Sequence, residues 1–196
     1  MSLILFMETD EGLLLAGDSR LTRENDTNWH RDDCYKVFEC NDRIGIAFHG
    51  TADIKGVPIE QIINGFVTNG NVHDTVQDVA LNLKNYISQQ QLIPKTIFYV
   101  MGYDVNRQIY KIDFINDNFE DLSDCVHGSG GEDDVAWEMI KGNHEEHTTN
   151  TKAIKFIDVI YNETVKYVTS VGGPIDILMI TRNGTKWIRK KQNCSC

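Results

Sequence analysis

The most regular hydrophobic pattern in the chain lies at its start, where two apolar runs flank a short polar cluster. The runs are Leu3–Met7 and Leu13–Ala16, and the cluster between them reads ETDEG. Apolar runs separated in this way are typical of two strands joined by a tight turn. Counting back from a two-residue loop at Asp10-Glu11 pairs residues whose numbers sum to about 21, which places Ser2 beside Asp18-Ser19-Arg20. Because both runs are apolar on both faces, the hairpin is predicted to be buried on both sides.

The rest of the chain shows alternating groups of strand and helix patterns. Short apolar or alternating runs bounded by turn residues indicate further strands. The predicted strands are Cys34–Cys40, Arg43–His49, Thr96–Gly102, Gln108–Phe114, Glu120–His127, Ile175–Thr181 and Thr185–Arg189. Apolar residues at helical spacing indicate helices that each cover a sheet with one stripe. The predicted helices span about 51–67, 73–90, 133–141 and 151–168.

The order of these elements predicts the architecture. Strands, two helices, strands, two helices and strands follow one another along the chain. Two antiparallel sheets packed face to face, with a helix pair on each outside, would bury every apolar stripe in this order. The predicted fold is therefore α+β, a four-layer αββα sandwich. The chain shows no internal repeat or linker, so residues 1–196 are expected to form a single domain.

Several connections carry more specific expectations. A polar connection is predicted from Thr22 to Asp33, and a turn is predicted at Gly128-Ser-Gly-Gly131, leading into the third helix. Thr51 or Asp53 is a candidate N-cap of the first helix. Because Pro58 lies inside that helical segment, a break or a late start is expected near it.

Composition and charge narrow the functional class. The chain has 196 residues, 41% of them hydrophobic, with a formal net charge of −10 and a pI of about 5.0. Such an acidic chain disfavours nucleic acid or an anionic membrane as a partner. No apolar run approaches the roughly 18–20 residues of a membrane span, and the first strand is too short and lacks the basic flank of a signal peptide. Five scattered cysteines fit neither a disulfide framework nor a zinc site, so reduced thiols in a cytoplasmic protein are expected.

Ser2 is the first candidate for chemistry. If Met1 is removed, Ser2 carries a hydroxyl and a free α-amine, and such an amine titrates near ~7.7–8.0. A hydroxyl activated by the amine of its own residue is a recognised nucleophile design. Small residues after Met are common in any chain, so the hairpin alone leaves a purely structural Ser2 open.

Five short motifs follow one another over nearly the full chain. They are Gly12-Leu-Leu-Leu-Ala-Gly-Asp-Ser-Arg-Leu-Thr22, Tyr35-Lys-Val-Phe38 with Asp42-Arg-Ile-Gly45, Ala47-Phe-His-Gly-Thr-Ala-Asp53, His127-Gly-Ser-Gly130 and Gly172-Gly-Pro-Ile-Asp176. In this order and spacing, the chain resembles the proteasome β-subunit family of N-terminal-nucleophile (Ntn) hydrolases, together with its bacterial relatives.

The resemblance implies a catalytic set. Ser2 falls where these enzymes carry the mature N-terminal threonine, and Asp18 and Lys36 match the acid and the lysine whose salt bridge lies beside that nucleophile. The lysine charge would depress the pKa of the neighbouring amine, which keeps the amine neutral and able to take the hydroxyl proton. Gly50 matches the residue whose backbone N–H stabilises the tetrahedral oxyanion. Ser129 matches the serine that hydrogen-bonds near the amine.

The resemblance also implies where a substrate would lie. Thr22 and Ala52 match positions at which the substrate backbone adds as an extra strand. An apolar first specificity pocket would be lined by Leu21, Cys34, Phe38 and Phe48. The chain departs from the family at one acid, usually found just before the late Gly-Gly element, where it has Tyr167 or Val168.

The implied function is a proteasome-like peptidase that acts on peptides or unfolded protein, needs no cofactor or metal, and works in a self-compartmentalising homo-oligomeric ring. Whether the ring works with an ATPase partner is left open by the sequence. Methionine aminopeptidase, which tolerates Ser next, would remove Met1. A retained Met1 and the missing late acid would instead favour a catalytically silent scaffold subunit of a ring. An Ntn amidase that acts on a small amide is a third reading.

The candidate residues also have plainer structural readings. Lys36 alternates with apolar neighbours as an exposed strand residue would, while Gly50 and Ser129 suit turns. Asp18 ends a buried strand, where a charged residue usually has a partner, so it is predicted to pair with Lys36. The segment His144-Glu-Glu-His147 lacks the zinc-protease spacing and is interpreted as a solvated loop.

Overall fold

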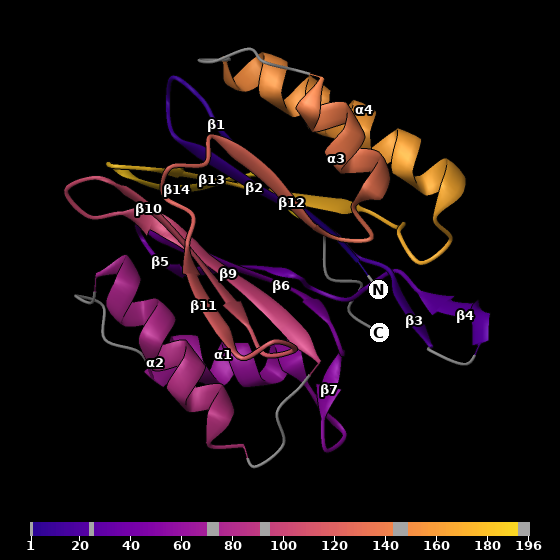
Figure 1. Cartoon of the computed structure of the whole chain (residues 1–196), viewed down its shortest axis with the longest axis horizontal. Helices are drawn as coiled ribbons and strands as arrows, with labels where there is room; N and C mark the ends of the chain where they lie inside the picture. Colours follow the sequence, from indigo (N-terminus) through magenta and orange to yellow (C-terminus); the bar gives the residue numbers. More distant parts are fainter. Residues whose placement is uncertain (1, 24–25, 70–74, 91–94, 143–148, 192–196) are drawn as a thin grey trace.

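The computed structural model describes residues 2–23, 26–69, 75–90, 95–142 and 149–191. Two five-stranded antiparallel sheets lie face to face, with a pair of helices against the outside of each (Figure 1). The first sheet has the order β12-β1-β2-β13-β14, with bounds His127–Gly131, Leu3–Glu8, Leu13–Asp18, Ile175–Thr181 and Gly184–Arg189. The second has the order β11-β10-β9-β6-β5, with bounds Asn118–Asp121, Arg107–Asp113, Thr96–Tyr103, Ile44–Gly50 and Val37–Asn41. The predicted αββα sandwich is confirmed.

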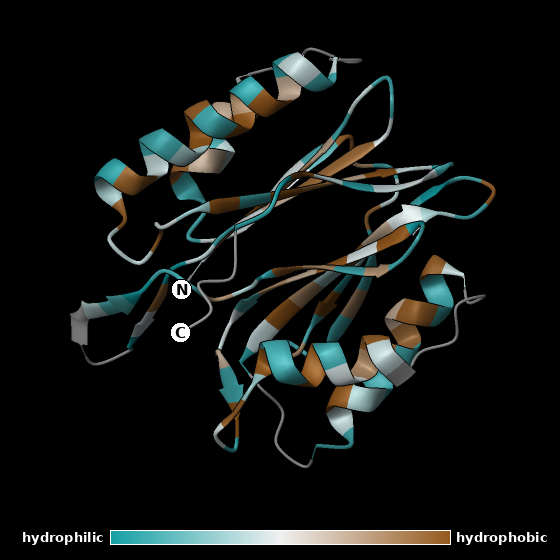
Figure 2. Ribbon diagram, turned by 180° about the vertical axis from the view of Figure 1, so that it is seen from behind, coloured by the Kyte–Doolittle hydropathy of each residue, from teal (hydrophilic) through white to brown (hydrophobic). Residues whose placement is uncertain are grey.

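Two helices cover the outer side of each sheet. Helices α3 (Asp134–Lys141) and α4 (Asn150–Tyr167) lie over the first sheet, and α1 (Ile59–Asn69) and α2 (Val76–Ser88) over the second (Figure 1). Buried apolar side chains form three clusters, one between the sheets and one between each sheet and its helices. Both teal and brown residues appear along the helices in Figure 2, as expected for helices that cover a sheet with one stripe. Within the described ranges, no helix has the length and apolar character that a bilayer crossing requires.

Strand β1 shows why its sequence is apolar at every position. Leu3 and Leu5 pack in the cluster beneath α3 and α4, whereas Ile4 and Phe6 belong to the cluster between the sheets. Successive side chains of a strand point to opposite faces. A strand that lies between two packed layers therefore needs apolar residues in both alternating sets.

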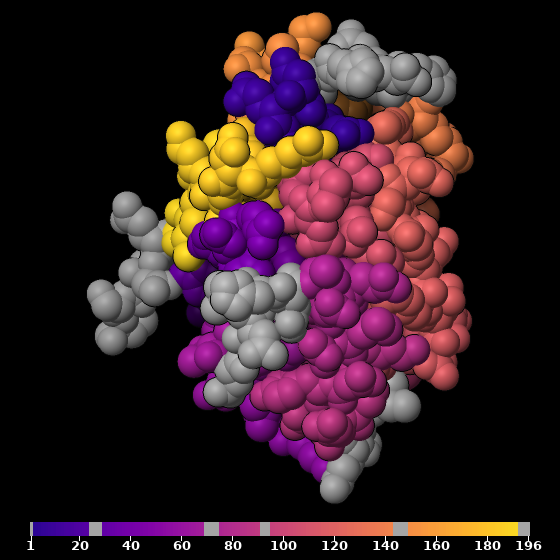
Figure 3. Space-filling view, turned by 90° about the vertical axis from the view of Figure 1, so that its left-hand side faces the viewer, coloured from indigo at the N-terminus to yellow at the C-terminus, as the bar shows by residue number. Residues whose placement is uncertain are grey.

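The β1–β2 hairpin has the predicted register, with Ile4 opposite Gly17 and Leu5 opposite Ala16. Its turn lies at one end of the sandwich, together with the turns that join β9 to β10 and β13 to β14 (Figure 1). Figure 3 shows these indigo, pink and yellow segments meeting on one face of the molecule. Ser2 and Asp18 lie at the other end of the hairpin.

The connection after β2 contains a ribbon that the sequence did not predict. Strands β3 (Leu21–Arg23) and β4 (Asp26–Arg31) pair antiparallel where a polar connection was expected. The Arg23 guanidinium lies 4.1 Å from the centroid of the Trp29 ring. Because no apolar alternation marks these strands, the hydrophobic pattern gave no signal for them.

The first helix starts late, as Pro58 indicated, but neither expected residue caps it. A ribbon of β7 (Asp53–Ile54) and β8 (Val57–Pro58) precedes the helix. The Asp53 carboxylate accepts a hydrogen bond from the Gly56 amide inside this ribbon, at 3.0 Å, and the Thr51 hydroxyl donates to the Lys95 carbonyl at 3.3 Å. The predicted cap is therefore wrong, because Asp53 bonds within the ribbon and Thr51 bonds to the segment before β9.

Three predicted segments near the candidate site also differ. The strand expected over Cys34–Cys40 begins only at Val37, and the strand expected over Glu120–His127 is divided between β11 and β12. The turn expected at Gly128–Gly131 belongs to β12, which pairs with β1. A Cβ added to Gly128 would lie 2.3 Å from the ring of Phe6, so this glycine lets an aromatic ring lie against the strand.

Candidate functional site

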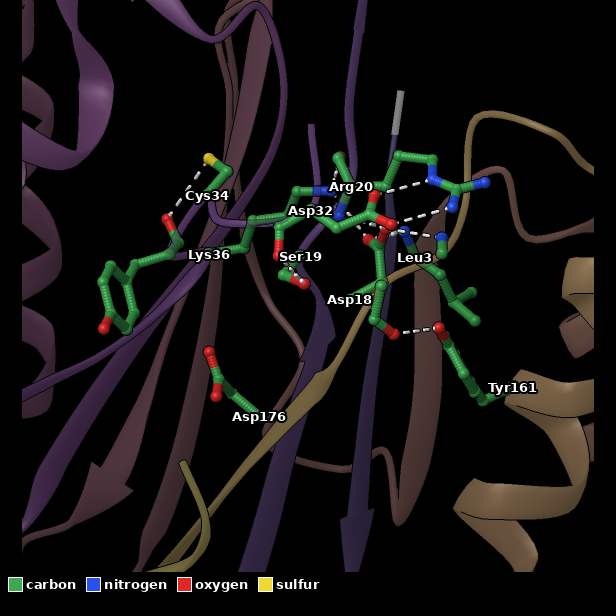
Figure 4. Close-up of polar contacts among 12 residues, drawn as sticks. Leu3, Asp18, Ser19, Arg20, Asp32, Cys34, Lys36, Tyr161 and Asp176 are labelled. Atoms are coloured by element: carbon green, nitrogen blue, oxygen red, sulfur yellow. Dashed lines mark hydrogen bonds and ion pairs between the residues drawn. The ribbon is translucent and has the colours of Figure 1, made fainter. Parts of the chain in front are cut away.

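Asp18 is the last residue of β2, and its carboxylate accepts four hydrogen bonds (Figure 4). Oδ1 accepts from the Leu3 amide and from the Lys36 ammonium, each at 2.8 Å. Oδ2 accepts from the amides of Arg20 and Gly172, each at 3.1 Å. Asp18 is 1% exposed, and a buried charge is tolerated when it is paired and hydrogen-bonded. The predicted pairing with Lys36 is present.

Lys36 reaches this carboxylate from the irregular segment before β5. Its ammonium also donates to the Arg20 carbonyl at 2.5 Å, and its side chain is 2% exposed. Reading Lys36 as an exposed strand residue is therefore wrong. The Lys36 carbonyl accepts from the Phe48 amide of β6 at 3.1 Å. Lys36 thus connects the end of the first sheet to the second.

Ser2 lies directly before β1 and is 3% exposed. Its carbonyl accepts from the Glu132 amide at 2.8 Å, and the next amide, that of Leu3, is held by Asp18. Gly131 allows this close approach, because a Cβ added there would lie 1.8 Å from the Ser2 carbonyl oxygen and its φ is +98°. Ser2 is therefore fixed from both sides, next to the Asp18–Lys36 pair.

Gly50 ends β6 in a conformation that favours glycine. Its φ is +114°, and an added Cβ would lie 2.2 Å from the Lys95 carbonyl oxygen. Two residues later, the half-buried Ala52 accepts from the Ile59 amide at 2.8 Å and so joins the start of α1. The backbone from Gly50 to Ala52 is therefore held by the edge of β9 and by the first helix.

The residues assigned to an apolar specificity pocket lie in one cluster. Cys34, Phe38 and Phe48 are buried between the second sheet and its helices, and Leu21 of β3 packs against them. The rings of Phe38 and Phe48 stack with centroids 6.2 Å apart. Thr22 follows Leu21 and pairs with His30 in the β3–β4 ribbon. These apolar residues therefore lie in one cluster, and their role in a specificity pocket stays a prediction.

Ser129 occupies a different place from the one expected of a turn residue. It lies on β12 opposite Leu5, and its hydroxyl donates to the Asp133 carboxylate at 3.1 Å. Its carbonyl accepts from the Tyr99 hydroxyl at 3.4 Å. The Ser129 hydroxyl is therefore bonded to the residue that precedes α3. Its β1 partner, Leu5, is three residues after Ser2 in the chain.

The polar residues around the Gly172-Gly173 turn were not predicted from the sequence. Arg20 binds both oxygens of Asp32, at 2.8 and 2.9 Å, and donates to the Thr169 carbonyl at 3.2 Å. The hydrogen bond from Arg20 lowers the pKa of the Asp32 carboxyl. The Tyr161 hydroxyl donates to the Gly173 carbonyl (Figure 4). The arginine two residues after Asp18 was the available signal, since a charged residue leaving a buried strand usually has a partner.

The two residues found where the family pattern has an acid lie at the end of α4. Tyr167 is 73% exposed, and the Val168 carbonyl accepts from the Val171 amide at 3.2 Å. An acid instead meets the Gly-Gly turn from the β4 side: a Cβ added to Gly173 would lie 2.6 Å from the Asp32 Cβ. The carboxylate beside the Gly-Gly turn is therefore that of Asp32, which follows β4, and does not come from the end of α4.

His49 is the next-to-last residue of β6, and its ring lies between the sheets, near Gly130 of β12. Its ring stacks on Tyr99 with centroids 6.0 Å apart, and among the described residues its Nε2 is buried without a hydrogen-bond partner. Burial lowers the pKa of His49 to about 4; the charges of Lys111 and Lys36 lower it as well, and Asp113 raises it. The imidazole is therefore neutral in the folded protein near pH 7.

This histidine predicts acid sensitivity. Below about pH 6.5 the unfolded chain protonates this histidine while the folded chain does not, so the free energy of unfolding should fall as the pH falls from there to about 4, by roughly 3 kcal/mol. Urea denaturation at several pH values measures the change. His49→Gln should flatten the dependence, whereas His30→Gln, at an exposed position of β4, should leave it unchanged. An equal slope in His49→Gln and the wild type would contradict the prediction.

Two parts of the sequence prediction, Met1 and His144–His147, lie outside the described residues. Across the ranges that the structure does describe, no three His, Cys, Asp or Glu residues gather as metal ligands would.

Comparisons with known proteins agree with this geometry. A family model for proteasome subunits matches residues 4–180. Among solved structures, the chain is similar to the Anbu (Gly-1) mutant from Hyphomicrobium sp. strain MC1, with a TM-score of 0.77 and 15% sequence identity, covering 97% of this chain and 86% of that one. At this identity the likeness shows the fold alone. A search of curated protein sequences gave no significant match. Because the family model covers most of its length, the chain belongs to the proteasome subunit family.

Proposed function

We propose that this chain is a proteasome-like peptidase in which Ser2, made N-terminal by removal of Met1, is the nucleophile. The observation that carries the proposal is that one oxygen of Asp18 holds both the amide directly after Ser2 and the Lys36 ammonium. The same carboxylate oxygen therefore holds the backbone next to Ser2 and the Lys36 ammonium. Taking an ion pair out of water costs free energy, so a purely structural site gains nothing evident from burying Lys36 here.

The proposed reaction uses the free α-amine of Ser2 as the general base. The Ser2 hydroxyl attacks the carbonyl carbon of a peptide bond, and its proton passes to the amine. The Gly50 N–H stabilises the oxyanion of the tetrahedral intermediate. As the C–N bond breaks, the leaving amine takes the proton and the acyl group remains as an ester on Ser2. Water, deprotonated by the same amine, then hydrolyses this ester and regenerates Ser2.

Lys36 sets the protonation of that amine in the proposed mechanism. A nearby cation lowers the pKa of an amine, so that more of it is neutral and able to accept a proton near pH 7. Asp18 and the Arg20 carbonyl hold the ammonium in place. Because Lys36 is buried, its field is weakly screened by solvent and salt.

The apolar cluster supports a peptide substrate with a large apolar side chain. The substrate backbone would add as a strand beside Thr22 and Ala52, and its side chain would enter among Leu21, Cys34 and Phe48. We propose that the chain acts in a cytoplasmic homo-oligomeric ring, which native mass spectrometry would detect as a defined multiple of the 22.3 kDa chain.

Covalent labelling tests the nucleophile. A peptide epoxyketone with an apolar side chain next to the warhead should add its mass to the chain that lacks Met1, because Ser2 offers a hydroxyl and an amine to the two electrophilic carbons. Ser2→Ala should lose Met1 equally well and give no adduct. Ser2→Thr should lose Met1 and still form the adduct. Ser88→Ala, a serine on α2 far from the hairpin, is the matched control and should label fully.

One observation favours the alternative of a silent scaffold subunit, namely the absence of an acid at Tyr167–Ser170 before the Gly-Gly turn. The same experiment separates the two functions. A chain that keeps Met1 and gives no adduct would overturn the peptidase proposal and favour the scaffold. A chain that loses Met1 and still gives no adduct would overturn it as well, and would leave the scaffold and the small-amide amidase.

A further inference from the structure

A second buried ion pair lies beside the first and has no part in the reaction above. Asp176 is 1% exposed on β13, directly after Ile175, which pairs with Asp18. The Lys191 Nζ lies 3.8 Å from Asp176 Oδ2, and the Lys191 amide donates to Oδ1 at 2.6 Å. Although Lys191 lies beyond the end of β14, its side chain is only 7% exposed. Burial raises the pKa of Asp176 and lowers that of Lys191, so each charge depends on the other.

Lys191 also contacts the segment that carries Lys36. Its ammonium donates to the Cys34 carbonyl and lies 4.0 Å from the centroid of the Tyr35 ring. Figure 4 shows Cys34 and Asp176 on the same side of Asp18 as Lys36. Lys191 therefore ties this segment to β13, the strand that pairs with the strand of Asp18.

The segment before β5 depends on such contacts, since residues 33–36 have no regular secondary structure. The Cys34 amide donates to the Ser19 carbonyl at 3.1 Å, and the Tyr35 amide donates to the Glu60 carboxylate at 3.0 Å. The donor to the Cys34 carbonyl is Lys191. Without the Lys191 ammonium, the buried Cys34 carbonyl and the buried Asp176 carboxylate would each lose a partner, which costs free energy. A shift of residues 33–36 toward water would lower this cost.

We propose that Lys191 is a positioning residue, which acts through the Cys34 carbonyl to hold the segment that presents Lys36 to Asp18. The inference rests on the proposed function, because a fixed Lys36 matters through its field at Ser2. A displacement of about 1 Å at a reacting centre can cost roughly 10²-fold in rate, so a small shift of the segment is enough.

Lysine NMR tests the positioning without any need for activity. In protein labelled with ¹³C at the lysine ε-carbon, the Lys36 signal is identified by its loss in Lys36→Arg. Lys191→Met should move this signal. The matched control is Lys190→Met, whose exposed ammonium lies 4.5 Å from the Trp187 ring, and it should leave the Lys36 signal in place. If Lys191→Met does not fold, Asp176→Asn makes the same test with a smaller expected shift.

Labelling kinetics test the consequence for the reaction. In Lys191→Met the maximal rate of epoxyketone labelling, counted per folded molecule, should fall at least about tenfold, while the probe concentration that gives half that rate changes little. Lys190→Met should keep the wild-type rate. A role confined to stability would lower the melting temperature and leave both the rate per folded molecule and the Lys36 signal unchanged.

The outcomes are distinguishable. A Lys36 signal that moves no more in Lys191→Met than in Lys190→Met overturns the positioning role, whatever the labelling shows. Absence of labelling in the wild type overturns the proposed function, and the NMR comparison alone then decides whether Lys191 places Lys36.

Discussion

Replacing Lys36 by Met should nearly abolish covalent labelling of Ser2. Without the cation, more of the amine is protonated near pH 7, and the negative charge left on Asp18 favours the protonated form further. We therefore expect most of the general-base contribution to be lost, ~10²–10⁴-fold in rate. The substitution also leaves Asp18 charged, buried and without its ion-pair partner, and breaking a buried pair in this way costs about 3–5 kcal/mol of stability. Intact mass after timed exposure to the epoxyketone measures the rate, and urea denaturation measures the stability.

A double variant and a control separate the loss of labelling rate from the loss of stability. Asp18→Asn with Lys36→Met removes both charges, so it should recover part of the stability but none of the labelling. Lys166→Met is the control, because Lys166 pairs with Glu163 on the exposed side of α4, at 2.7 Å, and should change neither quantity appreciably. Labelling of the folded Lys36→Met protein at the wild-type rate would show that the cation does not act on Ser2.

Gly131→Ala should displace Ser2. The added methyl carbon would lie 1.8 Å from the Ser2 carbonyl oxygen, so the start of β1 or β12 must move and the bond from the Glu132 amide must stretch or break. We expect a loss of roughly 10²-fold in the labelling rate, since a shift of about 1 Å at a nucleophile has an effect of this size. Labelling by intact mass and thermal denaturation together measure the result.

The chain offers a matched control for this substitution at Gly56. Gly56 also has a positive φ, of +78°, but an added Cβ would meet nothing within 4 Å. Gly56→Ala should therefore cost only the backbone strain, roughly 1–2 kcal/mol, and leave the labelling rate unchanged. Equal labelling rates in Gly131→Ala and Gly56→Ala would contradict the claim that β12 fixes Ser2.

The sequence predicted the parts of the site that follow from strand geometry. The register of the opening hairpin follows from its loop, and that register alone places Asp18 beside the start of the chain. The pairing of Asp18 with Lys36 was predicted because a charge at the end of a buried strand needs a partner. These inferences succeeded because they depend on local pattern and on the cost of burying a charge.

The parts that failed depend on contacts between distant segments. Cys34 to Lys36 looks like a strand in sequence, but distant donors and acceptors, including Glu60 and Lys191, take up its peptide groups. Lys191 itself lies in a basic run near the end of the chain, where the hydrophobic pattern gives no signal of a buried side chain. Gly128–Gly131 looks like a turn because glycine-rich segments usually are, yet here the glycines let β12 lie close to aromatic rings and to Ser2.

The bonds that close the site join residues that leave the ribosome at very different times. The Gly172 amide binds Asp18 across 154 positions of sequence, and the Glu132 amide binds Ser2. A nascent chain therefore cannot assemble the site until most of its length has been synthesised. Under the proposed function, this delay keeps the hydroxyl unreactive toward neighbouring nascent proteins during translation. It also leaves the initiator methionine accessible to its aminopeptidase before folding buries Ser2.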